Sequence, residues 1–185
     1  MKAAVFIERD GILARSTTAG GGTATRLEDF QVIESAAESL KALRDAGFLI
    51  YATTNQPGVT SGAPTRRELD LMHSVMVRKL ALSGVLVCPH PLDDACPCRK
   101  PQPGLLRDAA STSGIDLEHS FVVSGHWSDA EMAETVGATS VLIRSDQNGH
   151  GHHDLVVTDL KGAVVKILEV AQGMGTLRVL AASRR

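Results

Sequence analysis

Short apolar runs alternate along the chain with segments whose apolar residues recur at helical spacing. A continuous run such as Ala3–Ile7 is typical of a strand buried on both faces of a sheet. By contrast, Leu69, Met72 and Met76 share one face of a predicted helix. Six strands are expected: Ala3–Ile7, Phe48–Thr54, Gly84–Val87, Phe121–Ser124, Thr139–Ile143 and Leu155–Val157. Five helices are expected: Ser35–Ala46, Thr65–Leu82, Pro103–Ser113, Asp129–Val136 and Leu160–Val170.

This alternation of strands and helices predicts an α/β fold built on a doubly wound parallel sheet. Sheets of this kind bind ligands at the carboxyl ends of their strands. Polar residues directly after each strand are therefore the first candidates for a functional site. The chain shows no repeat at a fixed period and no domain-sized linker, which favours a single domain.

Composition and charge exclude several classes of protein. The chain has 185 residues, 43% hydrophobic and 22% charged, which is typical of a globular domain. Its 19 Lys and Arg against 21 Asp and Glu, with 3% aromatic residues, argue against nucleic-acid binding. No apolar run approaches the roughly 18 residues of a membrane span, and the N-terminal run meets Glu8 too early for a signal peptide. With only three cysteines, we expect a cytoplasmic protein.

Charged and polar residues follow the first three major strands. Glu8 and Asp10 leave the first strand two residues apart and could share a cation or a phosphate, or simply form a solvated turn. Thr54 and Asn55 follow the second strand as donors for a phosphate, or as the N-cap of a helix. The pair Arg99-Lys100 precedes a predicted helix and supplies two cations, which could equally be ordinary exposed charges.

All three cysteines lie in one loop, in the pattern Cys88-Pro89-His90 followed by Cys96-Pro97-Cys98. Three thiolates and one imidazole are a tetrahedral zinc set, and structural zinc sites fill all four positions with protein ligands. The alternative is two unrelated cysteine pairs. A zinc ion here would fix the loop that carries Arg99 and Lys100. A second cluster, 150–154, is rich in histidine but is not assigned to the site, and the apolar run 177–182 could pack on a partner.

Together these segments resemble the haloacid dehalogenase (HAD) superfamily, and within it the small bacterial phosphatases for heptose bisphosphate and histidinol phosphate. Residues 4–11 match the family's apolar strand and Asp-Arg-Asp-Gly-Thr, and residues 54–59 match Thr-Asn-Gln-Ser-Gly-Ile. Residues 98–104 match Cys-Arg-Lys-Pro-x-Pro-Gly. The resemblance implies a HAD-like Rossmannoid domain over 1–172, with a small zinc-binding loop, no large cap domain, and a C-terminal tail over 173–185.

The resemblance also implies a role for each matching residue. Position 8 would hold the nucleophile that attacks phosphorus, and Asp10 would be the general acid and base. Thr54, Asn55 and Lys100 would hold the phosphoryl oxygens, and Arg99 would recognise the rest of a small phosphorylated metabolite. Mg²⁺ would be bound by the residue at position 8, a backbone carbonyl and an aspartate of the fourth motif.

The chain departs from the family pattern at the centre of the site. The nucleophile position holds Glu8 in place of Asp. One extra methylene moves the carboxylate oxygen by roughly an ångström, and a displacement of this size can lower the rate about a hundredfold. In the fourth motif, Gly125 stands where the family has its metal-binding Asp, and only Asp129 remains. A residual magnesium site would have to use Glu8, Asp10 and Asp129. These departures predict that hydrolysis is impaired or lost.

Three hypotheses follow. The chain is a Mg²⁺-dependent sugar-phosphate phosphatase that tolerates Glu8, or a non-catalytic protein that binds phosphate esters or an acidic partner. The third possibility is a scaffold for another sugar-nucleotide enzyme, which the sequence neither supports nor opposes. None of the three involves nucleic acid or a membrane, and no protein partner is identified.

Overall fold

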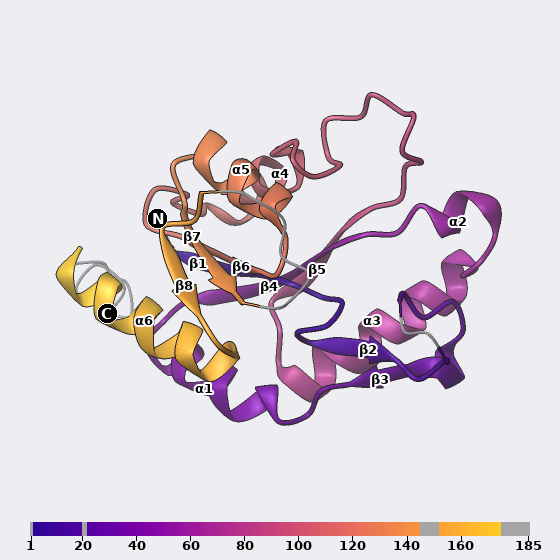
Figure 1. The fold of residues 1–185 in the computed structure, drawn as a ribbon, viewed down its shortest axis with the longest axis horizontal. Coiled ribbons are helices and arrows are strands. Elements are labelled where there is room, and N and C mark those ends of the chain that lie inside the picture. Colours follow the sequence, from indigo (N-terminus) through magenta and orange to yellow (C-terminus); the bar gives the residue numbers. More distant parts are fainter. Residues whose placement is uncertain (1, 20–21, 145–151, 175–185) are drawn as a thin grey trace.

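The computed structural model describes residues 2–19, 22–144 and 152–174. Its centre is a six-stranded parallel sheet in the order β5-β4-β1-β6-β7-β8 (Figure 1). The strands are β1 (Ala4–Glu8), β4 (Leu49–Asn55), β5 (Gly84–Cys88), β6 (Phe121–Ser124), β7 (Thr139–Ile143) and β8 (Leu155–Val157). All six are the predicted strands, with ends that differ by one residue at most. The prediction of a doubly wound α/β fold is confirmed.

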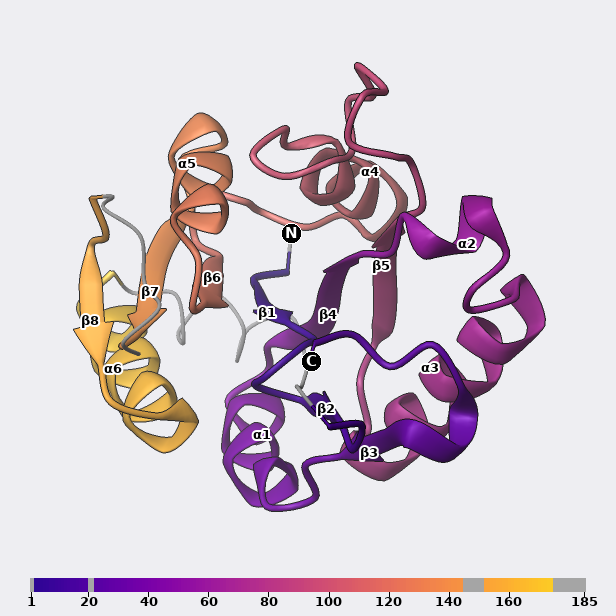
Figure 2. The ribbon, with the colours of Figure 1, turned by 45° about the vertical axis from the view of Figure 1, so that its right-hand side comes forward.

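Helices cover both faces of the sheet (Figure 2). On one face lie α1 (Ala36–Asp45), α3 (Arg66–Leu80) and α6 (Leu160–Gly173), and on the other α4 (Gly104–Ser113) and α5 (Trp127–Thr135). Strand β1 alternates between the two layers, since Val5 and Ile7 belong to the core under the first group and Ala4 and Phe6 to the core under the second. This explains why β1 is apolar throughout.

Four short elements were not predicted. These are β2 (Ala14–Ser16), β3 (Phe30–Val32), the 3-10 helix η1 (Leu27–Asp29) and α2 (Gly58–Ser61). The strands β2 and β3 pair as an antiparallel hairpin beside α3. Unlike the equally short β6 and β8, which are largely apolar, these four segments mix polar and apolar residues, so the hydrophobic pattern gives no signal for them.

The helix ends follow local chemistry. At the start of α3, the Thr65 hydroxyl accepts from the Glu68 N–H while the Glu68 carboxylate accepts from the Thr65 N–H, which is a capping box. The predicted start at residue 65 is therefore the N-cap itself.

Helix α6 extends to Gly173, one residue into the predicted tail. The apolar run 177–182 and residues 150 and 151 of the histidine cluster lie outside the described residues. The boundary between domain and tail therefore stays a prediction. Within the described ranges, no helix has the length and apolar character needed to cross a membrane.

Candidate functional site

Three neighbouring strands bring the predicted site residues to one edge of the sheet. Strand β1 lies between β4 and β6, with Glu8 in register with Thr53 and Ile7 with Val123. Glu8, Thr54 and Gly125 therefore meet where the three strands end. Two further predicted site residues lie at the same edge. Lys100 comes from the segment before α4, and Asp129 from the first turn of α5.

Asp10 is held by a dense set of donors. The Arg9 Nη2 atom is 2.7 Å from Asp10 Oδ1, and Arg9 Nε is 3.1 and 3.2 Å from the two carboxylate oxygens. On the other side, Thr54 Oγ1 donates to Asp10 Oδ2 at 3.0 Å, and Gln56 Nε2 donates to the same oxygen at 3.3 Å. These contacts fix the orientation of the Asp10 carboxylate before any ligand binds.

The guanidinium of Arg9 is completely buried, and its remaining contacts come from other elements. Its Nη1 lies 3.0 Å from Nε2 of His73, a buried residue of α3, and its charge lies over the Phe30 ring at 5.5 Å. Burial, and then the charge of Arg9, lower the pKa of His73 to about 4. His73 is therefore neutral at pH 7, and its Nε2 accepts a hydrogen bond from Arg9 Nη1, which links the site to α3.

This arrangement predicts an acid-sensitive contribution to stability. Between the unfolded pKa of about 6.5 and the folded pKa of about 4, the unfolded chain binds more protons than the folded one at His73. Stability is therefore lost as pH falls through this window, by roughly 2 kcal/mol between pH 7 and pH 5.

Urea denaturation of wild type and His73→Gln at both pH values measures this contribution. We expect the glutamine variant, which keeps an acceptor for Arg9, to lose less stability on acidification than wild type. Equal losses in both proteins would contradict the assignment to His73.

Lys100 forms a buried ion pair. Its Nζ is 2.7 Å from Asp129 Oδ1 and 3.9 Å from Glu8 Oε1, and the Lys100 and Asp129 side chains are 5% and 2% exposed. The alternative that Lys100 is an ordinary surface charge is therefore wrong. Because the Asp129 pair sets the position of the ammonium, Lys100 faces the site with a defined geometry.

Glu8 does not extend freely into the site. Its Oε2 accepts from Ser124 Oγ at 3.1 Å and from the Gly125 N–H at 3.0 Å, so the carboxylate leans against the end of β6. His126 Nε2 lies 3.5 Å from Glu8 Oε1. Burial raises the pKa of Glu8, against the opposing effect of Lys100. Burial thus disfavours the charged form of Glu8, and one of its two oxygens already accepts two hydrogen bonds.

The site residues line a cavity with two adjoining lobes. The inner lobe, about 300 Å³, is lined by Thr54, Asn55, Lys100 and Asp129, among others. The outer lobe, about 470 Å³, extends towards β2 and the turn after β1. The lobes share four lining residues, which are Glu8, Asp10, Thr23 and His126.

Arg99 is placed apart from the other predicted site residues. Its Nη1 donates to the His90 backbone oxygen at 2.9 Å, and it lines neither lobe. The structure thus brings together Glu8, Asp10, Thr54, Asn55, Lys100 and Asp129, but not Arg99. In this arrangement Arg99 braces the cysteine loop.

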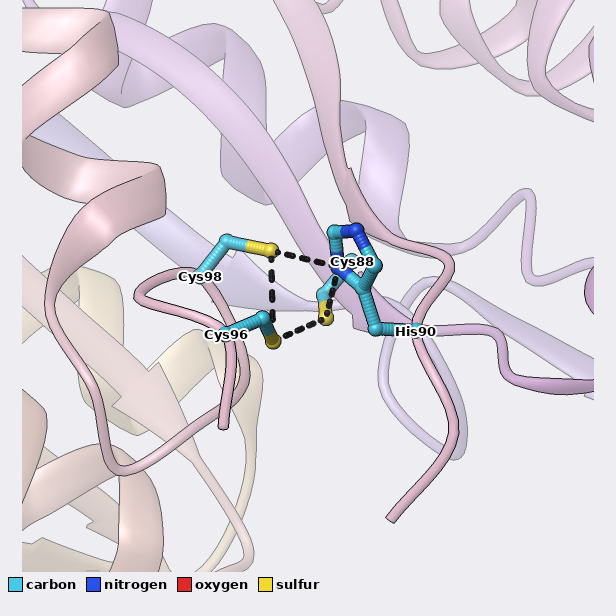
Figure 3. A group of neighbouring side chains, drawn as sticks. All are labelled: Cys88, His90, Cys96 and Cys98. Atoms are coloured by element: carbon cyan, nitrogen blue, oxygen red, sulfur yellow. Dashed lines mark hydrogen bonds between the residues drawn. The ribbon is translucent and has the colours of Figure 1, made fainter. Parts of the chain in front are cut away.

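The cysteine loop brings its four predicted ligands together (Figure 3). The Cys88–Cys96 and Cys96–Cys98 Sγ distances are 3.6 and 3.7 Å, and His90 Nδ1 lies 3.6 Å from Cys88 Sγ and 3.1 Å from Cys98 Sγ. A tetrahedron with Zn–S bonds of about 2.3 Å has edges of about 3.8 Å. The donor set and its spacing therefore fit a structural zinc ion, although zinc binding itself stays a prediction.

Chain packing reinforces this loop. Gly104 N donates to the Pro97 oxygen at 2.8 Å, and a Cβ at position 104 would lie 2.3 Å from that oxygen. Only glycine allows the start of α4 to approach the loop this closely. The loop that carries the predicted zinc ligands and Lys100 is thus packed directly against the start of α4.

The predicted magnesium ligands are arranged differently. Within the part of the chain that the structure describes, the Cys88–Cys98 group is the one set of three or more acidic, histidine or cysteine ligands whose atoms lie within 4.8 Å of one another. Glu8, Asp10 and Asp129 do not converge in this way, because each carboxylate is held by other residues. Ser124 and Gly125 donate to Glu8, Arg9 donates to Asp10, and Lys100 donates to Asp129. Asp129 Oδ2 is buried without a partner, but one oxygen is not a magnesium site. The residues as arranged do not fit the ion.

Sequence reasoning gave no role to several residues that line or support the site. Arg9 and Gln56 lie inside the matched motifs, but nothing in a single sequence shows that they hold Asp10. His73 and Arg15 come from elements outside the motifs, and only the fold brings them near. His126 follows β6 directly, so the rule that ligands bind at strand ends could have found it.

The sheet order and the arrangement of residues at its edge define the class as a HAD-like α/β fold. A family model described as HAD-hydrolase-like matches residues 97–165. The D-glycero-beta-D-manno-heptose-1,7-bisphosphate 7-phosphatase of Haemophilus ducreyi is 32% identical over 176 residues, covering 86% of this chain and 94% of that protein. A D-glycero-alpha-D-manno-heptose-1,7-bisphosphate 7-phosphatase of Mycobacterium tuberculosis is 35% identical over 152 residues, covering 78% of each chain.

A solved structure agrees with these relatives. The D,D-heptose 1,7-bisphosphate phosphatase of B. bronchiseptica, complexed with magnesium and phosphate, matches with a TM-score of 0.78 at 26% identity. The match covers 92% of this chain and 100% of that one. The chain therefore belongs to the HAD family of hydrolases, in the group that contains the heptose-1,7-bisphosphate phosphatases.

Proposed function

We propose that the protein binds a phosphorylated sugar in the cavity at the strand ends and hydrolyses it slowly or not at all. The observation that carries the proposal is that Lys100, Thr54 and Asn55 line one polar lobe while Glu8 is turned onto Gly125. The positions that bind phosphate in the family thus keep matching residues. By contrast, the two positions at which the family has aspartate are Glu8 and Gly125 in this chain.

Charge at the inner lobe supports binding of a phosphate. Asp10 and Asp129 are each paired with a cation, Arg9 and Lys100, at 2.7 Å. Glu8 is more readily protonated than a free glutamate because burial raises its pKa.

Within this proposal Thr54, Asn55 and Lys100 contact the phosphate, and Asp10 would be the general acid if turnover occurs. The zinc ion at Cys88, His90, Cys96 and Cys98 is structural. The substrate class comes from the relatives, which are phosphatases of a heptose bisphosphate. An alternative is an active phosphatase that uses Glu8 as its nucleophile despite these contacts. It is favoured by Lys100 Nζ and His126 Nε2, which lie 3.9 and 3.5 Å from Glu8 Oε1.

Binding of orthophosphate tests the proposal. Lys100→Met alone would leave Asp129 buried without a partner, so both residues are replaced in Lys100→Met/Asp129→Leu, an exchange that is often neutral for stability. We expect orthophosphate to raise the melting temperature of wild type and to have at least about tenfold lower affinity for the double variant, which corresponds to about 1.4 kcal/mol.

The matched control replaces the exposed ion pair of Lys79 and Glu34 in the same way, as Lys79→Met/Glu34→Leu. This control should bind orthophosphate as wild type does. If orthophosphate does not bind wild type, or binds all three proteins alike, the inner lobe is not a phosphate site and the proposal fails.

A further inference from the structure

The outer lobe of the cavity presents a cation that the proposed function does not use. Arg15, on β2, lines this lobe together with Ser16 and the turn that holds Gly11 and Ile12. The Arg15 side chain is exposed, so ligand and solvent can reach it. The cavity therefore has Lys100 at its inner end and Arg15 in its outer lobe.

Arg15 is oriented by the hairpin. Its Nε donates to Gln31 Oε1 at 2.8 Å, across a pair of residues in direct register on β2 and β3. Its two terminal nitrogens make no hydrogen bond or ion pair within the described ranges. A guanidinium held at Nε and open at Nη1 and Nη2 is suited to a two-point contact with a phosphate or carboxylate.

Nearby acids do not neutralise this charge. Glu28 and Glu34 line the neighbouring surface groove together with Arg15. Each has its own cation, however, because Glu28 pairs with Arg26 at 2.8 Å and Glu34 pairs with Lys79. The positive charge of Arg15 is therefore available to a ligand.

We infer that Arg15 determines specificity by binding a second anionic group on the ligand whose phosphate occupies the inner lobe. The inference rests on the proposed function. The two lobes share Glu8, Asp10, Thr23 and His126, so one extended molecule can span them. The ligand class is a sugar phosphate that carries a further phosphate or carboxylate at its far end. Arg99, the arginine that the family resemblance implies for substrate recognition, lines neither lobe.

Binding of three phosphorylated sugar derivatives, measured by titration calorimetry, tests the inference. Fructose 6-phosphate has one anionic group, fructose 1,6-bisphosphate adds a phosphate, and 6-phosphogluconate adds a carboxylate. We expect wild type to bind at least one of the two doubly anionic compounds about tenfold or more tightly than fructose 6-phosphate. Arg15→Gln should reduce this ratio to near one and leave orthophosphate affinity unchanged. Whichever compound shows the ratio identifies the second group.

Two further variants make the result specific. Arg66→Gln removes an exposed arginine of α3 that pairs with Asp70 and should behave as wild type does. Arg99→Gln should keep the ratio, since Arg99 is outside both lobes. The inference is overturned if wild type shows no preference, if Arg15→Gln keeps it, or if Arg99→Gln alone removes it. If wild type does not bind orthophosphate, the proposed function is overturned instead, and this inference with it.

Discussion

Phosphate release should increase at least about a hundredfold over wild type in the double variant Glu8→Asp/Gly125→Asp. Aspartate at position 8 is one methylene shorter, so its carboxylate withdraws from the Ser124 and Gly125 donors that now hold Glu8. Aspartate at position 125 supplies the missing second carboxylate, and Gly125 is not among the residues with positive φ, so its backbone conformation does not require glycine. The assay measures orthophosphate released from heptose 1,7-bisphosphate in the presence of Mg²⁺.

Two further variants show which groups carry the gain. Adding Asp10→Asn to the double variant should abolish it, because the amide cannot act as general acid. Glu8→Asp alone should give a smaller gain, since the carboxylate at position 125 is still absent. A double variant no faster than wild type would show that the exchange at positions 8 and 125 is not what limits hydrolysis.

Loss of the zinc ligands should have the largest effect on stability. Cys98→Ser removes one corner of a four-ligand group, and loss of a structural metal is among the changes that cost about 4 kcal/mol or more. For a chain of this size each kcal/mol shifts the melting temperature by about 2–4 °C, so we expect a decrease of about 10 °C. Metal analysis should find one zinc per wild-type chain and less in the variant.

A histidine pair provides the matched control for the zinc prediction. His90→Asn removes a predicted ligand, whereas His119→Asn removes a histidine outside the cysteine loop that lies 3.1 Å from Asp116 Oδ2. The first should lower both the zinc content and the melting temperature, and the second should change neither by a comparable amount. Full zinc content in both Cys98→Ser and His90→Asn would contradict the proposed site.

The sheet was predictable because its central strands are buried on both faces and form continuous apolar runs. Phe6 and Ile7 face opposite cores, so no polar residue interrupts β1 until Glu8. The hairpin of β2 and β3 was not predictable, since neither strand is a continuous apolar run and their pairing depends on contacts far apart in the chain. This matters for function, because the hairpin carries Arg15.

The site was predictable as far as its residues follow the strands or repeat a family motif. Strand order brought Glu8, Thr54 and Gly125 together, and the motif before α4 brought Lys100 to Asp129. Side-chain direction was not predictable. The sequence gives no sign that Glu8 bends onto Gly125 or that Arg99 turns to His90, because both outcomes depend on donors supplied by other segments.

The most direct test of the proposed function is a phosphorus NMR time course of wild type with heptose 1,7-bisphosphate and Mg²⁺. One experiment reports both binding, as broadening or shift of the ester resonances, and hydrolysis, as the appearance of orthophosphate. The arrangement of Lys100, Thr54 and Glu8 predicts perturbed ester resonances with little orthophosphate over a time in which the Glu8→Asp/Gly125→Asp variant consumes the ester. Rapid release by wild type, at the rate of that variant, would contradict impaired hydrolysis, and unperturbed resonances would contradict binding.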